Sequence, residues 1–152
     1  LGQATNLIYE ATLLNEVLKT DPFNPQDKNN NDSTIAHVID GSLDNHSISE
    51  IAGVSNIGND INWTGHPFGQ ANWYSYGRLA WDYNLSPSTI ADEWIRQTFS
   101  NNLTFVDSIK KLMIASREAV VNYMTPLGLH HIMGYGHHSV PAPWYVTAPR
   151  PT

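Results

Sequence analysis

The sequence contains no cysteine and few basic residues, and both absences exclude classes of protein. Without cysteine the chain can form neither a disulfide framework nor a zinc ribbon. Eight Lys plus Arg face fourteen Asp plus Glu, a formal net charge of -6, and no basic cluster is longer than the pair Lys110 and Lys111. Nucleic acid and anionic membranes are therefore not expected as partners.

Long apolar runs are also missing. No stretch approaches the roughly 20 apolar residues that cross a bilayer, so we expect no membrane-spanning helix. The chain opens on Leu1 and closes on the Pro-broken run APRPT, and we expect it to be a piece of a longer polypeptide. A fragment could not show a leader, so cytoplasmic, periplasmic and secreted locations all stay open.

Apolar periodicity predicts a mainly α-helical chain with long loops. Apolar residues at spacings of three and four predict an amphipathic helix over residues 4–19. The polar run over residues 20–33 cannot bury enough apolar surface to order strongly, so it is a candidate boundary or solvent loop. Residues 33–39 could form a short helix or a strand, because the run is too short for periodicity to decide, and we assign them to a helix. The segment that follows is punctuated by Gly, Asp and Asn, and we expect a structured loop there.

Two further helices have clear start signals. Ser86 can cap a helix whose first residue is Pro87. Thr104 and Asp107 can form a capping box for a longer helix, which Pro126 is expected to stop, and loop is expected in the tail beyond it. The buried stripe predicted for this longer helix comprises Val106, Ile109, Met113, Ser116, Val120 and Tyr123.

The stretch GHPFGQANWYSYGRLAW, residues 65–81, is dense in aromatic side chains and carries one charged side chain, Arg78. A helix beginning near Pro67 is expected, and its apolar side chains would point in nearly every direction. Such a helix is typically buried on all sides, and a platform of rings for a sugar ligand is the alternative.

The polar residues of this stretch narrow its interpretation. On a buried helix, Gln70 and Asn72 must hydrogen-bond to neighbouring loops or to a ligand, since an unpaired polar group costs about 1 to 3 kcal/mol. Arg78 is expected to pair with a buried carboxylate rather than with an acidic substrate.

Five sequence blocks occur in order along the chain and carry a resemblance that runs over residues 1–150. They are LGQATNLIYEATLLNEVL, VIDGSLDNHSISEIAGVSNIGNDINWTGHPFGQANWYSYGRLAWD, IADEWIRQTF, SREAVVNYMTPLGLHHIM and GHH. Together they resemble the α-glucuronidases of glycoside hydrolase family 67. The resemblance implies an enzyme with a β-sandwich N-terminal domain, a central (β/α)₈ barrel and a mainly helical C-terminal domain that packs on the barrel and helps form dimers.

The resemblance also implies a division of this chain. Residues 1–21 would be the last segment of the (β/α)₈ catalytic barrel, and residues 22–152 a C-terminal α-helical domain that is incomplete at its C-terminus. The expected fold is therefore mainly α, with long ordered loops. The expected partners are the barrel domain of the same polypeptide, a second copy in a homodimer, and a glucuronoxylan-derived oligosaccharide.

The implied reaction is hydrolysis, with inversion, of the α-1,2 bond between (4-O-methyl)glucuronic acid and xylose in xylo-oligosaccharides, in xylan breakdown. No metal or organic cofactor is expected. The family's acid and base carboxylates would precede Leu1, so no catalytic residue is assigned to this chain. We interpret the prominent carboxylates of the chain as turn residues or exposed helix positions rather than as catalytic groups. They are Asp40, Asp44, Asp60, Asp82, Asp92 and Glu93.

The loop that carries Gly136, His137 and His138 is the best candidate for reaching the substrate, with a hydrogen-bonded structural loop as the alternative. Trp63 and Trp73 are further substrate-binding candidates, although core packing also accounts for each. Zinc is not expected, because adjacent His side chains diverge and the chain has neither Cys nor an HExxH motif.

Two other functions stay open from the sequence. One is a stand-alone carbohydrate-binding module that uses Trp63, Trp73 and Tyr76. The other is a dimerisation module without catalysis, in which apolar patches mediate association and touch no sugar.

Overall fold

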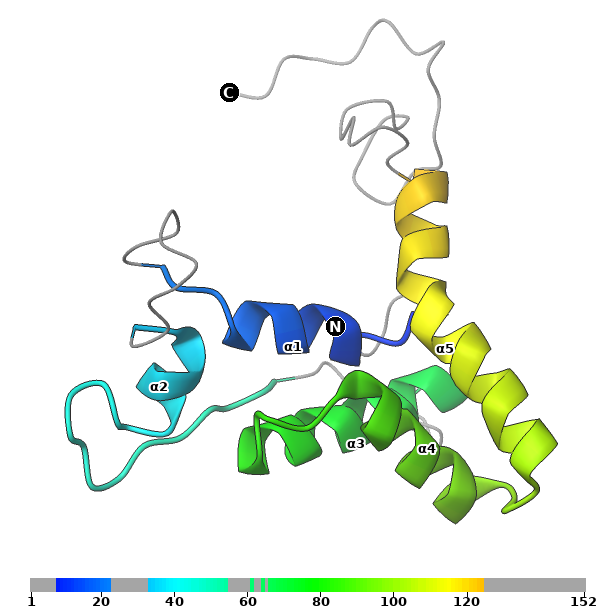
Figure 1. Cartoon of the computed structure of the whole chain (residues 1–152), viewed down its shortest axis with the longest axis horizontal. Coiled ribbons are helices and arrows are strands. Elements are labelled where there is room, and N and C mark those ends of the chain that lie inside the picture. Colours follow the sequence, from blue (N-terminus) through cyan, green and yellow to red (C-terminus); the bar gives the residue numbers. More distant parts are fainter. Residues whose placement is uncertain (1–7, 23–32, 55–60, 62–63, 65, 125–152) are drawn as a thin grey trace, which may run out of the picture.

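The computed structural model describes residues 8–22, 33–54, 61, 64 and 66–124, and these ranges hold helices and loops but no strand. The helices described are α1 (Ala11–Leu18), α2 (Ile35–Ile39), α3 (Pro67–Trp81), α4 (Pro87–Thr98) and α5 (Leu103–Met124). In Figure 1, α1 lies across α3 and α4, while α5 runs along one end of the group. The mainly α fold class is confirmed, and packing on a barrel stays a prediction.

Helix α3 begins where the sequence predicts. The Nδ1 atom of His66 accepts a hydrogen bond from the Gly69 N–H at 3.1 Å, and Pro67 occupies the first turn. Within the described residues α3 is not buried on all sides, and its burial against a larger body stays a prediction. Among the described helices, α1 and α4 make the most contacts with α3, which buries one stripe, while Gln70 is exposed and Trp81 is 88% exposed. The buried stripe comprises Gly69, Ala71, Ser75 and Leu79.

The cap predicted for α4 is confirmed, whereas the capping box predicted for α5 is wrong. Ser86 Oγ accepts the Thr89 N–H at 3.0 Å. On α5 the capping side chain is Asn102, whose Oδ1 accepts the Phe105 N–H at 3.0 Å. Because Asn102 caps the helix by accepting the Phe105 N–H, the helix already begins at Leu103. Thr104 therefore lies inside the first turn and forms no capping box.

The first helix is shorter than predicted. Residues 8–10 are not helical, and α1 begins only at Ala11. The periodicity over residues 4–19 missed this because the Ile8 carbonyl and the N–H groups of Tyr9 and Glu10 bond to side chains distant in sequence, while the Glu10 carbonyl accepts the Leu14 N–H of the helix. Asn72 of α3 and Ser116 of α5 supply the side-chain bonds.

The short helix α2 and the loop after it agree with the sequence. Gly41 has φ +79°, and a Cβ at this position would lie 2.7 Å from the His46 carbonyl oxygen, so only glycine fits the turn. The His46 N–H closes this turn on the Gly41 carbonyl at 2.9 Å.

One apolar core joins the N-terminal segment to the helices. The rings of Trp94 and Phe99 meet edge to face in this core, with centroids 5.4 Å apart. The described helices include none that is long and apolar enough to cross a membrane. The buried cluster comprises Tyr9, Ala11, Leu18, Ala36, Ala71, Leu79, Ile90, Ala91, Trp94, Ile95, Val106 and Met113.

Candidate functional site

Among the predicted substrate-binding residues, Trp73 is the one that the structure describes. It lies half-buried on α3 and lines a cavity of about 280 Å³. Trp63, Gly136, His137 and His138 fall outside the described residues, so their proximity to this cavity stays a prediction.

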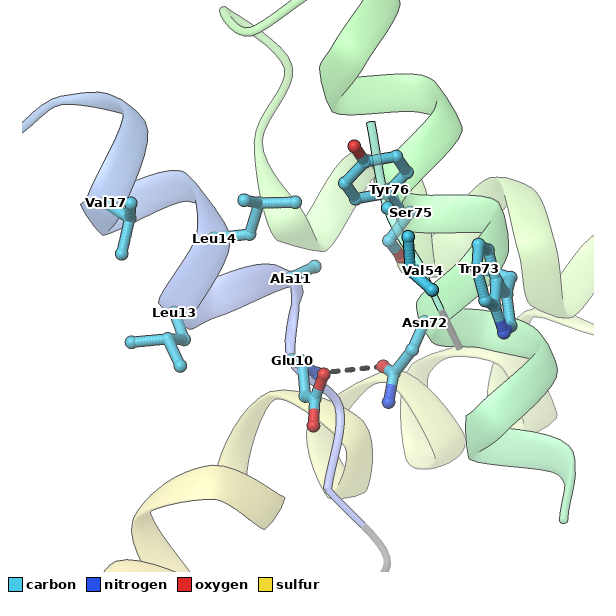
Figure 2. A pocket seen from close by; sticks show the side chains of 11 residues that line it. Glu10, Ala11, Leu13, Leu14, Val17, Val54, Asn72, Trp73, Ser75 and Tyr76 are labelled. Carbon is cyan, nitrogen blue, oxygen red and sulfur yellow. Dashed lines mark hydrogen bonds between the residues drawn. The ribbon is translucent and has the colours of Figure 1, made fainter. Parts of the chain in front are cut away.

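The cavity lies between α1, α3 and the segment that ends at Val54. Figure 2 shows Ala11 and Leu14 of α1 on the side of that helix that faces Val54 and the two rings of α3. The rings of Trp73 and Tyr76 meet edge to face, with centroids 6.3 Å apart. The lining comprises Glu10, Ala11, Leu13, Leu14, Val17, Gly53, Val54, Asn72, Trp73, Ser75 and Tyr76.

Tyr76 forms one wall of the cavity and holds a polar atom without a partner. A Cβ on Gly53 would lie 3.1 Å from Tyr76 Cζ, so the main chain passes directly over the ring. The Tyr76 hydroxyl is buried and forms no hydrogen bond in the described structure, and burial raises its pKa. It is a group that a bound hydrogen-bonding ligand could satisfy.

Glu10 is the acidic group of the cavity. Its backbone N–H donates to Asn72 Oδ1 at 2.9 Å (Figure 2), and partial burial raises the pKa of its carboxyl. Sequence reasoning did not single out Glu10, because its place in the cavity depends on Asn72, 62 residues away. An ionised carboxylate here disfavours a uronic acid, so the cavity suits a neutral sugar ring or an apolar group better.

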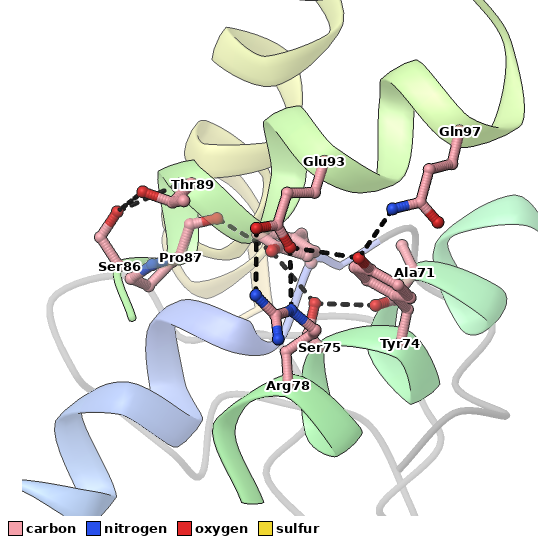
Figure 3. A network of polar contacts seen from close by, with 10 residues as sticks. Ala71, Tyr74, Ser75, Arg78, Ser86, Pro87, Thr89, Glu93 and Gln97 are labelled. Carbon is pink, nitrogen blue, oxygen red and sulfur yellow. Dashed lines mark hydrogen bonds and ion pairs between the residues drawn. The ribbon is translucent and has the colours of Figure 1, made fainter. Parts of the chain in front are cut away.

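The predicted pairing of Arg78 with a carboxylate is confirmed, although the carboxylate is not buried. Arg78 Nε and Nη2 donate to the two oxygens of Glu93 at 2.9 and 3.1 Å, and the Glu93 side chain is 32% exposed (Figure 3). The bonds from Arg78 hold the pKa of Glu93 below its usual value, and the Tyr74 hydroxyl adds a third bond at 3.1 Å. This fork commits the guanidinium to Glu93 and leaves it poorly placed to bind a substrate acid.

Other carboxylates have structural partners. Asp92 accepts bonds from Arg96 at 2.5 Å and Lys110 at 3.0 Å, and both lower its pKa. Asp40 and Asp82 accept backbone N–H groups two residues ahead at 2.8 and 3.0 Å, as turn residues do. Asp60 lies outside the described residues.

Metal binding has no candidate among the described residues, where no three His, Cys, Asp or Glu side chains gather in a way that could hold an ion. The His pairs at 130–131 and 137–138 lie outside the ranges described.

The described residues form a group of helices with a cavity lined by aliphatic side chains and two aromatic rings. An aromatic cavity is present, while the carboxylates Asp40, Asp82, Asp92 and Glu93 are committed to turns or ion pairs. Residues 1–63 match the glycosyl hydrolase family 67 middle domain, and residues 64–150 match the glycosyl hydrolase family 67 C-terminus. The chain belongs to glycosyl hydrolase family 67. The two matches meet between residues 63 and 64, and a division after residue 21 stays a prediction.

Curated relatives carry the same family signal. The chain is 36% identical over 129 residues to "Alpha-glucuronidase A" of Emericella nidulans, which covers 85% of this chain and 15% of that protein. It is 33% identical over 129 residues to "Alpha-glucuronidase" of Hypocrea jecorina, with the same coverage of 85% and 15%. The chain thus spans 15% of the length of these relatives.

Proposed function

We propose that this chain is part of an α-glucuronidase, called the parent enzyme below, that acts on xylo-oligosaccharides in xylan breakdown. The parent enzyme would hydrolyse the α-1,2 bond between (4-O-methyl)glucuronic acid and xylose with inversion. The observation that carries the proposal is the pair of consecutive family 67 matches over residues 1–150. The names of the similar proteins support it, since both are alpha-glucuronidases.

In this proposal the chain supplies scaffold, dimer surface and part of the substrate rim. An inverting glycosidase needs two carboxyl groups about 6.5 to 9.5 Å apart, and we place both in the part of the barrel that precedes this chain. Exposed apolar side chains support a role in association, with either the barrel or a second copy. The most exposed of them on α3 to α5 and their connections are Trp81, Phe99, Leu103 and Leu112.

The decisive experiment is an assay of the parent enzyme on aldouronic acids, with the first anomer of the released glucuronic acid read by NMR. Inversion at an α-bond must release the β-anomer first. The isolated chain, lacking the acid and base, is expected to give no turnover. Release of the α-anomer by the parent enzyme, or turnover by the isolated chain, would contradict the proposal.

The rim role is tested separately in the parent enzyme. Replacing His137 or His138 by Ala should raise the KM for aldouronic acid several-fold if these residues contact substrate. His46→Ala is the matched control, because the His46 side chain is 65% exposed in the loop after α2. If the KM is unchanged in both the His137 variant and the His138 variant, association is left as the role of this region.

A carbohydrate-binding function without catalysis is the second candidate, and the cavity beside Trp73 and Tyr76 favours it. Calorimetry of the chain with xylo-oligosaccharides should then show binding heat that Trp73→Ala abolishes. The aliphatic walls from Leu13, Leu14 and Val17 count against this candidate, because sugar hydroxyls need polar partners.

A further inference from the structure

Residues 8–10 are bonded to neighbouring helices chiefly through side chains. Asn72 Nδ2 donates to the Ile8 carbonyl oxygen at 2.9 Å, and Asn72 Oδ1 accepts the Glu10 N–H at 2.9 Å. The Tyr9 N–H donates to Ser116 Oγ at 2.8 Å. The side-chain amide of Asn72 thus bonds the carbonyl and the N–H that flank Tyr9, as the N–H and C=O of one residue in an adjacent parallel strand would.

The side chain of Tyr9 continues these contacts into α4. Tyr9 is 0% exposed, its hydroxyl donates to the Pro87 carbonyl oxygen at 2.9 Å, and it accepts from Ser75 Oγ at 3.1 Å. The hydroxyl of Ser75 has a single proton, which is shared between Tyr9 and the Ala71 carbonyl oxygen 2.8 Å from Ser75 Oγ, and Figure 3 draws the contact with Ala71. Helices α3, α4 and α5 therefore all contact the same three residues.

These bonds cross the junction between the two family regions. Residues 8–10 lie in the middle-domain match, whereas Asn72, Ser75, Pro87 and Ser116 lie in the C-terminal match. We infer that these four residues form a clamp that fixes residues 8–10 of the middle domain, and that Asn72 is a positioning residue for the reaction. This inference rests on the proposed function, because the acid and base that the clamp would help to align are placed in the middle domain.

A structural role and a positioning role predict different results. If Asn72 only stabilised the fold, its loss would lower the melting temperature and leave the folded enzyme's kcat unchanged. If Asn72 positions the middle domain, the folded variant should lose kcat while substrate binding, measured by KM, stays within about twofold, because misplaced groups cost rate.

The test uses the parent enzyme with Asn72→Leu, which removes the donor and the acceptor at similar volume. The control is Gln70→Leu, an exposed amide on the same helix. Hydrogen exchange of the Tyr9 and Glu10 amides should quicken at least about tenfold in Asn72→Leu alone, and kcat should fall about tenfold. Ser116→Ala, which removes the acceptor of the Tyr9 N–H and a bond from Ser116 to the Met113 carbonyl, replaces Asn72→Leu if that variant does not fold.

Each outcome decides a different point. Unchanged exchange of the two amides overturns the clamp, whatever the activity. Faster exchange with unchanged kcat overturns the positioning role. If the unaltered parent enzyme does not turn over any α-glucuronosyl substrate, the proposed function fails, and amide exchange still tests the clamp.

Discussion

Replacing Tyr9 by Phe should change how the stability of the chain depends on alkaline pH. Burial raises the pKa of the Tyr9 phenol from 10.0 to about 12, against a smaller opposing effect from the Ser75 hydrogen bond. The protonated phenol is the neutral form, so between pH 10 and 12 the folded chain keeps a proton that the unfolded chain has lost. The stabilisation is therefore complete below about pH 10 and is lost as the pH rises toward 12.

The size of the effect follows from the same two pKa values. A shift of two units corresponds to about 3 kcal/mol of unfolding free energy, and about 1 kcal/mol of it is lost by pH 11. At neutral pH, Tyr9→Phe removes the hydroxyl that serves Pro87 and Ser75, which should cost about 1 kcal/mol. The unfolding free energies of the unaltered chain and of Tyr9→Phe should therefore converge near pH 11, although the variant is less stable at pH 8.

Urea unfolding at pH 8, 10 and 11 measures this convergence. A spectrophotometric titration at the tyrosinate band should show one fewer late-titrating phenol in the variant. Tyr76 and Tyr83, whose pKa values are also raised, are present in both proteins and cancel in the difference. A stability difference that stays constant from pH 8 to pH 11 would refute the reasoning.

Three further predictions use the same unfolding assay. Met113→Ala, at a position 0% exposed, should cost about 2 to 5 kcal/mol, whereas Leu112→Ala, 58% exposed, should cost less than about 1 kcal/mol; equal costs would contradict the assigned core. Ser86→Ala should cost about 1 kcal/mol through the lost cap of α4, and Ser88→Ala close to nothing. Glu93→Gln should flatten the loss of stability below about pH 4.5, because the pKa of Glu93 is lowered in the fold; an unchanged acid limb would show that its ion pair contributes nothing.

The helices with local signals could be predicted from the sequence. Ser86 and Pro87 start α4, and Pro67 starts α3, because capping and proline effects depend on neighbouring residues. Asn102 was missed as the cap of α5 although it is a favoured capping residue, since Thr104 and Asp107 offered a second local pattern two residues later. The sequence thus offers two possible caps for this helix, and the structure uses the earlier one, Asn102.

The candidate site could be predicted only in part. Trp73 stood out by its side chain, and it does line the cavity. Glu10 could not be predicted as a cavity residue, because an acidic residue at the edge of an apolar stripe is usually just exposed to solvent. Its place beside Trp73 arises from the approach of α1 to α3, and no local pattern encodes that approach.

Residues 8–10 show how tertiary bonds override a helical pattern. Extending α1 backward over them would gain a few backbone hydrogen bonds, each worth about 1 kcal/mol net. The same extension would withdraw Tyr9 from its 0% exposed site and strip partners from Asn72, Ser116 and the Pro87 carbonyl. Burying a large aromatic side chain is worth about 2 to 3 kcal/mol, and each stranded buried polar group costs about 1 to 3 kcal/mol. The non-helical form therefore has the lower free energy, and the helical period of residues 4–19 reflects which residues are apolar rather than where the helix begins.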